Sequence, residues 1–497
     1  MRQVINQQLA FGQVDISKIK FDPKSRDDIP KILRGLQHIY ITPLLRAAIF
    51  ELLEKEVSPN VNKNNGRPGM ELWSILVLGV LRLDLNADYD RIHSLSNSHR
   101  ELRQMLGHSD FYDETYYNLQ TLKDNVSLLN EDLLVKINDI VVNGGHLLVG
   151  KKSDGEALHG RCDSFVVETN VHYPTDTNLL LDAMRKALFL SADLCSKYDI
   201  ADLRQYKYNF KQLKYTHRHI QKVRRGRVQV EKITAAHEDY LRLATKQLWK
   251  IKLVLIDIEK CRDLSITDSI IINDIHRYVE HANRQIDQIE RRVIHGEIIP
   301  HSEKVFSIFE PHTEWISKGK AGVPVEFGVR VCILEDQHQF ILHHRIMEKE
   351  TDNKVAVAMV MESQKRFPLL NTVSYDKGFH SPENQEQLSK ILDVVALPRK
   401  GKLSKASKEI EGTEEFRRAR KKHSAVESAI NGLEVHGLDC CPDHGIGGFR
   451  RYVALAVVAR NIHRIGDILY KREQLLLQSE ARKRLRAANL SCQRLAA

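Results

Sequence analysis

The sequence predicts a protein of several domains that combines an all-helical part with an α/β part. Its 497 residues exceed what one ordinary hydrophobic core accommodates. Apolar side chains recur at helical spacing through residues 1–150, whereas runs of β-forming residues alternate with helical segments after residue 155. The composition, with 42% hydrophobic and 28% charged residues, is that of a soluble globular chain.

The N-terminal part, residues 1–150, is predicted to be a bundle of short helices. Apolar residues repeat at steps of three and four in 33–40 and again in 72–83, and a Gly-Arg-Pro-Gly breaker at 66–69 lies between these segments. The short helices continue to Gly107. This pattern is compatible with helix-turn-helix DNA binding, and a plain helical domain fits it equally well.

The residues beyond 155 contain the elements of a mixed β-sheet flanked by helices. A run of β-forming residues from Ser164 to Val171 follows Asp163 directly, and a hairpin is predicted for 325–347. A helix at 354–366, a strand at 370–375, a helix after Pro382 and a strand at 394–397 are predicted next. Two further helices are predicted, one through Glu427 and one from Phe449 to Tyr470. Without the long helical segment that follows the first strand, this order is that of the ribonuclease-H-like fold.

These elements divide the chain into five parts. A long, polar helical segment with almost no Gly or Pro separates the first strand from the rest of the sheet. We expect a helical DNA-binding region at 1–150, followed by the first part of the α/β domain at 151–180 and a helical insertion at 181–300. The rest of the α/β domain is expected at 301–470, and a basic tail at 471–497.

The charge of the chain favours a polyanionic partner. The 75 Lys and Arg residues exceed the 65 Asp and Glu residues, which gives a net charge of +10. Residues 201–227 hold nine Lys or Arg, four aromatic residues and one acid, a composition suited to a nucleic-acid backbone and exposed bases. A solvated helix whose aromatic residues pack inward is the alternative. The residues expected to contact DNA are Lys207, Lys211, Lys214, Arg218, Arg224, Arg225, Arg399, Lys400 and Lys402.

Other partners and compartments are not indicated. The longest apolar stretch, near Leu72–Leu83, is interrupted and too short to span a bilayer, and the first residues lack the apolar core of a signal peptide. Seven cysteines fit a reducing cytoplasm better than a disulfide scaffold. No P-loop or dinucleotide glycine fingerprint occurs, so no nucleotide cofactor is expected. The short apolar stretch likewise gives no reason to expect a membrane partner.

Three acids are the candidate catalytic and metal-binding residues. Asp163 lies on the first strand, Asp376 follows a later strand, and Glu427 lies on a late helix. In a sheet of this order, acids at strand ends and on a following helix converge, and hard oxygen ligands suit Mg²⁺ or Mn²⁺. Two such ions would activate a water or a 3′-hydroxyl group for in-line phosphoryl displacement. A turn or cap role for each aspartate and a plain surface role for the glutamate are the alternatives.

The blocks around these acids resemble those of bacterial insertion-sequence transposases of the ISNCY group. Residues 163–176, 374–383 and 423–439 are similar to the three catalytic blocks, and 66–70 with the helices up to Gly107 resembles the N-terminal DNA-binding region. The resemblance covers nearly the whole chain. It implies a DDE triad, here Asp163, Asp376 and Glu427, and strand transfer at terminal inverted repeats.

The expected partners follow from this resemblance. They are double-stranded DNA, as terminal inverted repeats and target, and a second copy of the chain in the synaptic complex, with a cytoplasmic, nucleoid-associated location. Two other functions stay open on the sequence alone. One is a catalytically inactive DNA-binding protein descended from a transposase, and the other is a stand-alone nuclease of the same fold.

Overall fold

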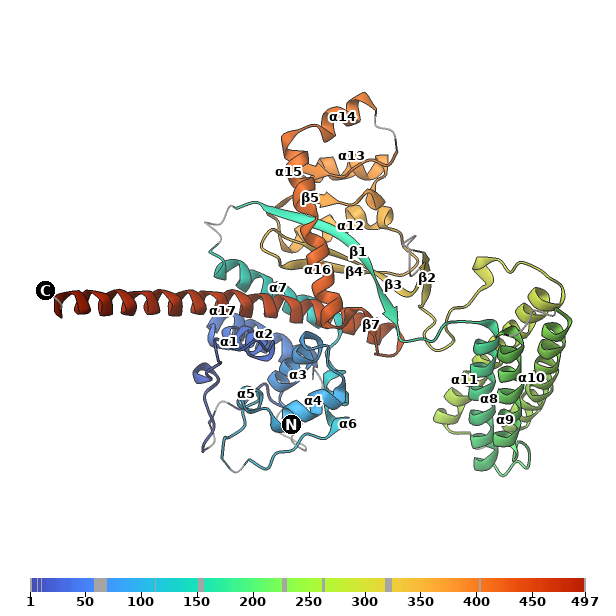
Figure 1. Ribbon diagram of the computed structural model, residues 1–497. Coiled ribbons are helices and arrows are strands. Elements are labelled where there is room, and N and C mark those ends of the chain that lie inside the picture. The colour runs from blue at the N-terminus through green and yellow to red at the C-terminus, as the bar shows by residue number, and fades with distance from the viewer. Residues whose placement is uncertain are drawn as a thin grey trace. The chain divides into compact units, whose positions relative to one another are not determined.

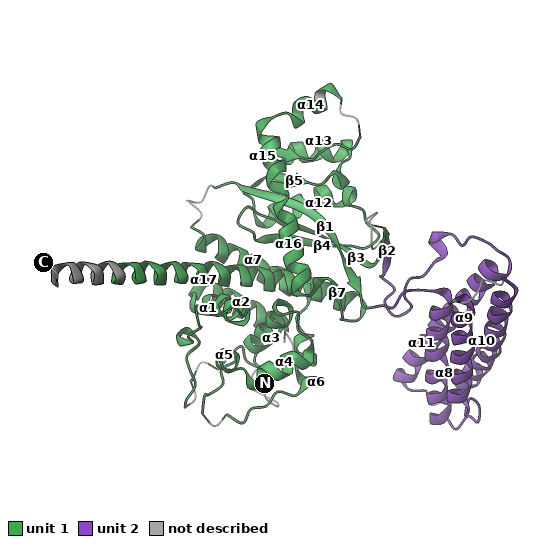
Figure 2. Cartoon of the chain, viewed as in Figure 1, with its two compact units in different colours: residues 1–170, 316–497 green, residues 171–315 purple. Residues whose placement is uncertain are grey.

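The chain folds into two compact units, which are coloured separately in Figure 2. Unit 1 comprises residues 1–170 and 316–497, and unit 2 comprises residues 171–315. The computed structural model describes all residues except 1, 7, 10, 58–68, 112, 151–155, 226–229, 262–263, 318–323, 402–403 and 496–497. Most of the predicted breaker at 66–69 therefore lies outside the described residues.

Unit 1 contains a mixed sheet of seven strands. The strands are β1 (Leu158–Thr169), β2 (Glu314–Ser317), β3 (Val325–Glu335), β4 (Ile341–Met347), β5 (Leu370–Tyr375), β6 (Val394–Ala396) and β7 (Cys440–Cys441). Strand β1 lies between β3, which is antiparallel to it, and β5, which is parallel to it. Strand β4 pairs with β3 in antiparallel fashion, and β6 extends the parallel side beyond β5. The order through β4 is thus β4-β3-β1-β5-β6, with the long β1 at its centre. Strand β2 also neighbours β3, and the short β7 pairs with the end of β1.

Helices pack on both faces of this sheet (Figure 1). The helices that follow the hairpin are α12 (Asp352–Arg366), α13 (Pro382–Ile391), α14 (Lys405–Glu411), α15 (Glu414–His423), α16 (Ala425–Leu433) and α17 (Gly445–Leu495). Tyr375 donates a hydrogen bond to the carbonyl of Ala356 in α12, whereas the preceding Ser374 contacts His423 in α15. Because successive strand residues point to opposite faces, α12 and α15 cover different faces of the sheet.

The N-terminal helices share one core with the sheet instead of forming a unit of their own. They are α1 (Ile29–Ile41), α2 (Pro43–Val57), α3 (Leu72–Asp84), α4 (Tyr89–Ser98), α5 (Arg100–Met105), α6 (Leu119–Val126) and α7 (Glu131–Leu148). Every residue of α3 is buried, which its continuous apolar sequence explains. Helix α17 packs against α1, α3 and α7, so the end of the chain completes the core that its beginning starts.

Two glycines allow α17 to lie against α1. A Cβ atom at Gly466 would lie 1.9 Å from the carbonyl oxygen of Lys31, and one at Gly35 would lie 2.3 Å from that of Ile462. The two helix backbones therefore touch where neither carries a side chain.

Unit 2 is a helical bundle with a separate core. Its long helices are α8 (Asp176–Lys197), α9 (Tyr206–Arg225), α10 (Val230–Glu259) and α11 (Ile266–Ile289). Two of these helices begin at side-chain caps. Thr175 caps α8, and Ser265 with Asp268 forms a capping box on α11. The predicted insertion 181–300 lies inside this unit, whose bounds are wider because α8 already starts at Asp176.

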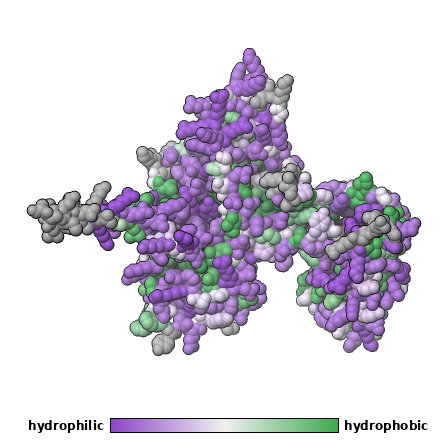
Figure 3. Space-filling model, in the orientation of Figure 1, coloured by the Kyte–Doolittle hydropathy of each residue, from purple (hydrophilic) through white to green (hydrophobic). Residues whose placement is uncertain are grey.

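Among the described residues, no helix combines the length and the apolar composition needed to cross a membrane. The top of unit 1 in Figure 3, around α14 and α15, is strongly hydrophilic.

Candidate functional site

The backbone register of two neighbouring strands brings Asp163 and Asp376 together. Cys162 of β1 is the register partner of Tyr375 of β5, and the two strands run parallel. The next residue on each strand path is an aspartate, and the backbone at Asp376 is still extended. Since adjacent strands lie about 4.8 Å apart, the two aspartates start from neighbouring backbone positions.

The two aspartates occupy the face of the sheet that α15 and α16 cover. Cys162 and Tyr375 point to the α12 face, where the Tyr375 hydroxyl donates to the Ala356 carbonyl. Side chains alternate along a strand, so Asp163 and Asp376 point to the opposite face. On that face Ser374 contacts the Nδ1 atom of His423 at 3.1 Å.

Glu427 reaches the same place from α16. Val426, Ala429, Ile430 and Leu433 are buried and hold α16 against the unit 1 core, which includes contacts with β1. Glu427 lies exposed in the first turn of this helix. The charge of Glu427 is one of the lesser causes that raise the pKa of Asp163.

Asp163 has a strongly perturbed acidity. Burial raises the pKa of Asp163 to about 7, with further contributions from the charges of Asp376, Glu427 and Asp352, although a hydrogen bond from the Ser164 amide opposes the change. Asp163 is half-buried, whereas Asp376 and Glu427 are exposed. The three predicted acids therefore belong to one electrostatic site, in which like charges crowd the most buried member.

The donor set fits hard divalent cations. A cation beside Asp163 would favour its ionised form and offset the repulsion between the carboxylates. Within the described part of the chain, the three carboxylates do not form a group whose oxygen atoms all lie within 4.8 Å of one another. Such an open arrangement suits ions that each bind part of the set better than a single ion held by all three acids.

Asp352 is a fourth acid at this site, and it was not among the residues predicted from the sequence. It is the first residue of α12, and its Oδ1 atom accepts a hydrogen bond of 2.6 Å from the Ser164 hydroxyl. A Cβ atom at Gly378 would lie 2.8 Å from the Asp352 Oδ2 atom, so this glycine, two residues after Asp376, makes room for the carboxylate. In the sequence Asp352 looks like an ordinary acid in a first helical turn, and only the position of α12 reveals its neighbours.

A basic surface adjoins the acids. Helix α15 exposes Arg417, Arg418, Lys421 and Lys422, and none of these four forms an ion pair with a described residue. A hollow of about 300 Å³ opens beside the helix. Its lining includes Arg161, Ser374, Arg418, Lys422 and His159. Arg161 and Ser374 precede Asp163 and Asp376 by two residues on the same strands, so the hollow adjoins the face that carries the acids.

Four of the predicted DNA-contacting residues of unit 2 follow one side of α9. Lys207, Lys211, Lys214 and Arg218 are exposed and recur at steps of four, three and four, which aligns them along the helix. We call these four residues the α9 basic stripe. Arg224 is exposed but lies in line with the buried face of the helix, and the Arg225 side chain lies outside the described residues.

The aromatic residues of α9 support both interpretations of this segment, contact with nucleic acid and inward packing of a solvated helix. Tyr206 and Phe210 pack on Phe189, with ring centroids 4.9 and 5.7 Å apart. Tyr208 and Tyr215 are 60% and 70% exposed beside the basic stripe. Half of the aromatic set is therefore structural, and half faces outward.

The remaining predicted contacts lie in unit 1. Arg399 and Lys400 are exposed, and Arg399 donates a hydrogen bond of 3.1 Å to Ser407. Lys402 falls outside the described residues.

Comparison of the chain with protein-family models, with curated proteins and with solved structures finds no match.

Proposed function

We propose that the protein is a DNA transposase of the DDE type, which cleaves and joins DNA strands at the ends of a mobile element. The observation that carries this proposal is the register of β1 and β5, which sets Asp163 beside Asp376, together with the charge of Glu427 on the same group. The strand order β4-β3-β1-β5-β6, with one antiparallel neighbour of β1, supports a ribonuclease-H-like catalytic domain.

In this function the three acids hold divalent cations against the scissile phosphate. When bound, Mg²⁺ or Mn²⁺ ions would activate the attacking hydroxyl and stabilise the leaving oxygen. Asp163, on the central strand, is the rigid member of the set, and Asp376 and Glu427 are open to DNA and solvent. Asp352 is a positioning residue, because it binds the Ser164 hydroxyl next to Asp163.

The basic surfaces would hold the DNA backbone. The exposed cations of α15 lie immediately before the helix that carries Glu427, so phosphates bound there would lie next to the acids. The α9 basic stripe provides a second row of cations, and the exposed Tyr208 and Tyr215 offer faces on which bases can stack.

The test is the substitution Asp376→Asn. An amide keeps the shape of the side chain but removes the charge that holds a divalent cation, so metal-dependent cleavage and strand transfer are expected to fall to background. Binding to element ends should stay close to that of the wild type, because it depends on phosphate contacts elsewhere. Labelled element ends, assayed with Mg²⁺ for joining and by gel shift for binding, measure both.

The matched control is Asp393→Asn, which changes an exposed aspartate just before β6 in the same unit. It should leave both activities unchanged. Equal loss of binding and catalysis in Asp376→Asn would contradict the proposal. A wild-type protein that binds ends but never cleaves would favour an inactive DNA-binding protein, and cleavage without joining would favour a nuclease.

A further inference from the structure

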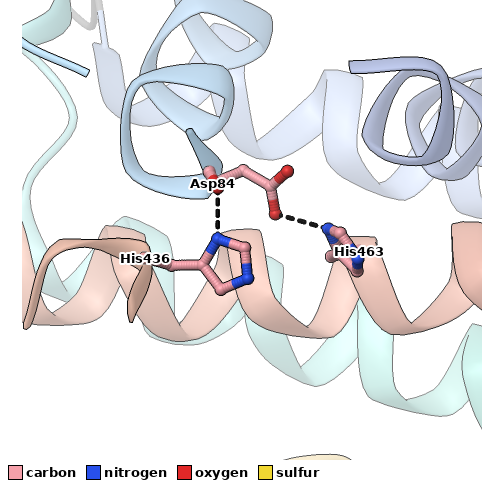
Figure 4. A group of neighbouring side chains, drawn as sticks. All are labelled: Asp84, His436 and His463. Carbon is pink, nitrogen blue, oxygen red and sulfur yellow. Dashed lines mark hydrogen bonds and ion pairs between the residues drawn. The ribbon is translucent and has the colours of Figure 1, made fainter. Parts of the chain in front are cut away.

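A second cluster of metal-ligating side chains lies away from the three acids, where the end of α3 meets α17. It consists of Asp84, His436 and His463, which Figure 4 shows as sticks. Each residue offers one ligand atom, and these three atoms all lie within 4.8 Å of one another. Among the described residues, no other group of three His, Cys, Asp or Glu side chains meets this distance limit.

The carboxylate of Asp84 is fully buried, and one of its two oxygen atoms accepts no hydrogen bond from a described residue. Its side chain is 0% exposed, and its Oδ1 atom lies 2.8 Å from the Nδ1 atom of His463. Its Oδ2 atom is buried and has no hydrogen-bond partner among the described residues. A buried carboxylate oxygen without a partner is costly, and a bound cation is one of the few groups that offset this cost.

His436 is brought to Asp84 by a break in the helix. It lies in the short helical turn η5 (Glu434–Leu438), and Gly437 beside it has a φ of +105°. A Cβ atom at Gly437 would lie 2.9 Å from the Tyr452 hydroxyl, so this turn requires glycine. The turn lets the His436 Nδ1 atom donate to the backbone carbonyl of Asp84.

We propose that Asp84, His436 and His463 bind one divalent transition-metal ion, with Zn²⁺ as the representative ligand. Two imidazoles and one carboxylate are a donor set suited to such ions, whereas Mg²⁺ prefers oxygen ligands alone. Zinc–ligand bonds of about 2.0–2.1 Å place two ligands of a tetrahedral ion roughly 3.3 Å apart. Binding of the ion would draw the three ligand atoms, which now lie within 4.8 Å of one another, together to about this separation.

The ion would act as a clamp between distant parts of unit 1. Asp84 ends the buried helix α3, His463 lies in α17, and His436 follows nine residues after Glu427. The clamp would therefore fix the segment behind α16 to the N-terminal helices. The site uses none of the residues assigned to strand transfer and stands independently of that proposed function.

The experiment measures Zn²⁺ binding and thermal unfolding of the full-length chain after removal of metal with a chelator. Wild-type protein is expected to bind about one added Zn²⁺ per chain in equilibrium dialysis and to unfold a few degrees higher with Zn²⁺ present. His436→Gln and His463→Gln should each weaken binding at least about tenfold and remove the thermal shift. His276→Gln, at an exposed histidine of unit 2 paired with Glu259, is the matched control and should behave as wild type.

Asp376→Asn separates this site from the three acids, because it should retain the Zn²⁺ and the thermal shift. A wild-type chain that neither binds Zn²⁺ nor gains stability from it would overturn the proposal without any variant. Equal Zn²⁺ retention by wild type and by folded histidine variants, checked by circular dichroism, would overturn it as well and leave a plain hydrogen-bonded cluster. Loss of Zn²⁺ from Asp376→Asn alone would assign the metal to the acids instead.

Discussion

At the scale of single residues, the molecule uses carboxylates in two opposite ways. Burial, with a smaller contribution from the neighbouring acids, favours the protonated form of Asp163. Asp113 in the loop between α5 and α6 is surrounded by donors, so its ionised form is favoured. A bound cation would offset the repulsion between Asp163 and the neighbouring acids. The hydrogen bonds to Asp113 hold its loop in place.

The acidity of Asp113 predicts a stability change at low pH. Burial raises its pKa, but hydrogen bonds from Thr115 and the charge of His108 outweigh burial and bring the pKa to about 2. A folded pKa below the unfolded value of 3.8 stabilises the native state above pH 4, and this contribution is lost as pH falls through 2. Asp113→Asn should therefore lower the free energy of unfolding by about 1–2 kcal/mol at pH 5, with the difference shrinking towards pH 2.

Urea unfolding of both proteins at several pH values between 2 and 5 measures this difference. Glu114→Gln changes the exposed neighbouring acid and serves as the control, with no pH-dependent difference expected. A difference between Asp113→Asn and wild type that stays constant down to pH 2 would contradict the linkage.

At the scale of elements, local patterns predicted those strands and helices whose own residues decide their structure. The strand predicted at 370–375 is β5, and the helix predicted at 354–366 is α12 with two more residues at its start. The first strand was predicted from Ser164, but β1 begins at Leu158. Its early residues pair with β3 and β5, and this distant pairing leaves no local signal.

The candidate site was predictable for the same reason and to the same extent. Asp163 and Glu427 lie on elements that the sequence pattern indicates, and Asp376 directly follows one. Their charges act together on the pKa of Asp163. Asp352 and the Asp84 cluster could not be found this way, because their neighbours come from elements far away in the chain. Metal binding and catalysis by the three acids stay predictions.

The contact between α1 and α17 predicts a sharp cost for a small substitution. Gly466→Ala places a Cβ atom 1.9 Å from the Lys31 carbonyl oxygen, which forces the helices apart. The expected loss is about 1–3 kcal/mol in the free energy of unfolding, seen as a lower melting temperature of unit 1.

Gly447→Ala is the control within the same helix, because a Cβ atom there meets no atom within 4 Å. It should leave the melting temperature unchanged or raise it slightly through higher helix propensity. Equal melting temperatures for the two variants would show that the backbones are not in close contact.

The α9 basic stripe predicts a change in the salt dependence of DNA binding. Replacing Lys207, Lys211, Lys214 and Arg218 with Ala removes up to four phosphate contacts, each worth a slope of about −0.9 in log K against log salt. The quadruple variant should bind more weakly, with a slope shallower by up to roughly three to four units. Discrimination between element ends and random DNA should change little, since phosphate contacts do not read bases.

Titrations at several salt concentrations, run beside sedimentation, measure the slope and the oligomeric state. Lys232, Lys246, Lys250 and Lys252 of α10, changed together to Ala, provide a control with the same loss of charge from the same bundle. An unchanged slope for the α9 variant, or an equal change for the α10 control, would rule out a specific role for the stripe.

At the scale of the whole molecule, the two units differ in which parts of the chain form their hydrophobic cores. Unit 2 is one continuous segment with its own core, whereas the core of unit 1 joins residues from both ends of the chain. The residues of unit 2 that pack together are all within 171–315. Its contacts are therefore local, and those of unit 1 are not.

This difference predicts that residues 171–315 fold when expressed alone. The fragment should show strongly helical circular dichroism and a cooperative thermal transition, because its core is complete. A fragment of residues 1–150 is the contrasting case and should be largely unfolded, since its buried helix α3 packs on α17. A fragment 171–315 without a cooperative transition would contradict the independence of unit 2.

The passage of α17 along the N-terminal helices also sets the order of events during synthesis. The surfaces of α1, α3 and α7 that α17 covers are made first, and the helix that covers them is made last. Until the ribosome has translated beyond Ile465, the buried face of α3 lacks its partner, so the nascent chain carries exposed apolar surface through most of its synthesis. Unit 2 ends at Trp315, 150 residues before Ile465, so it can fold while unit 1 still lacks α17.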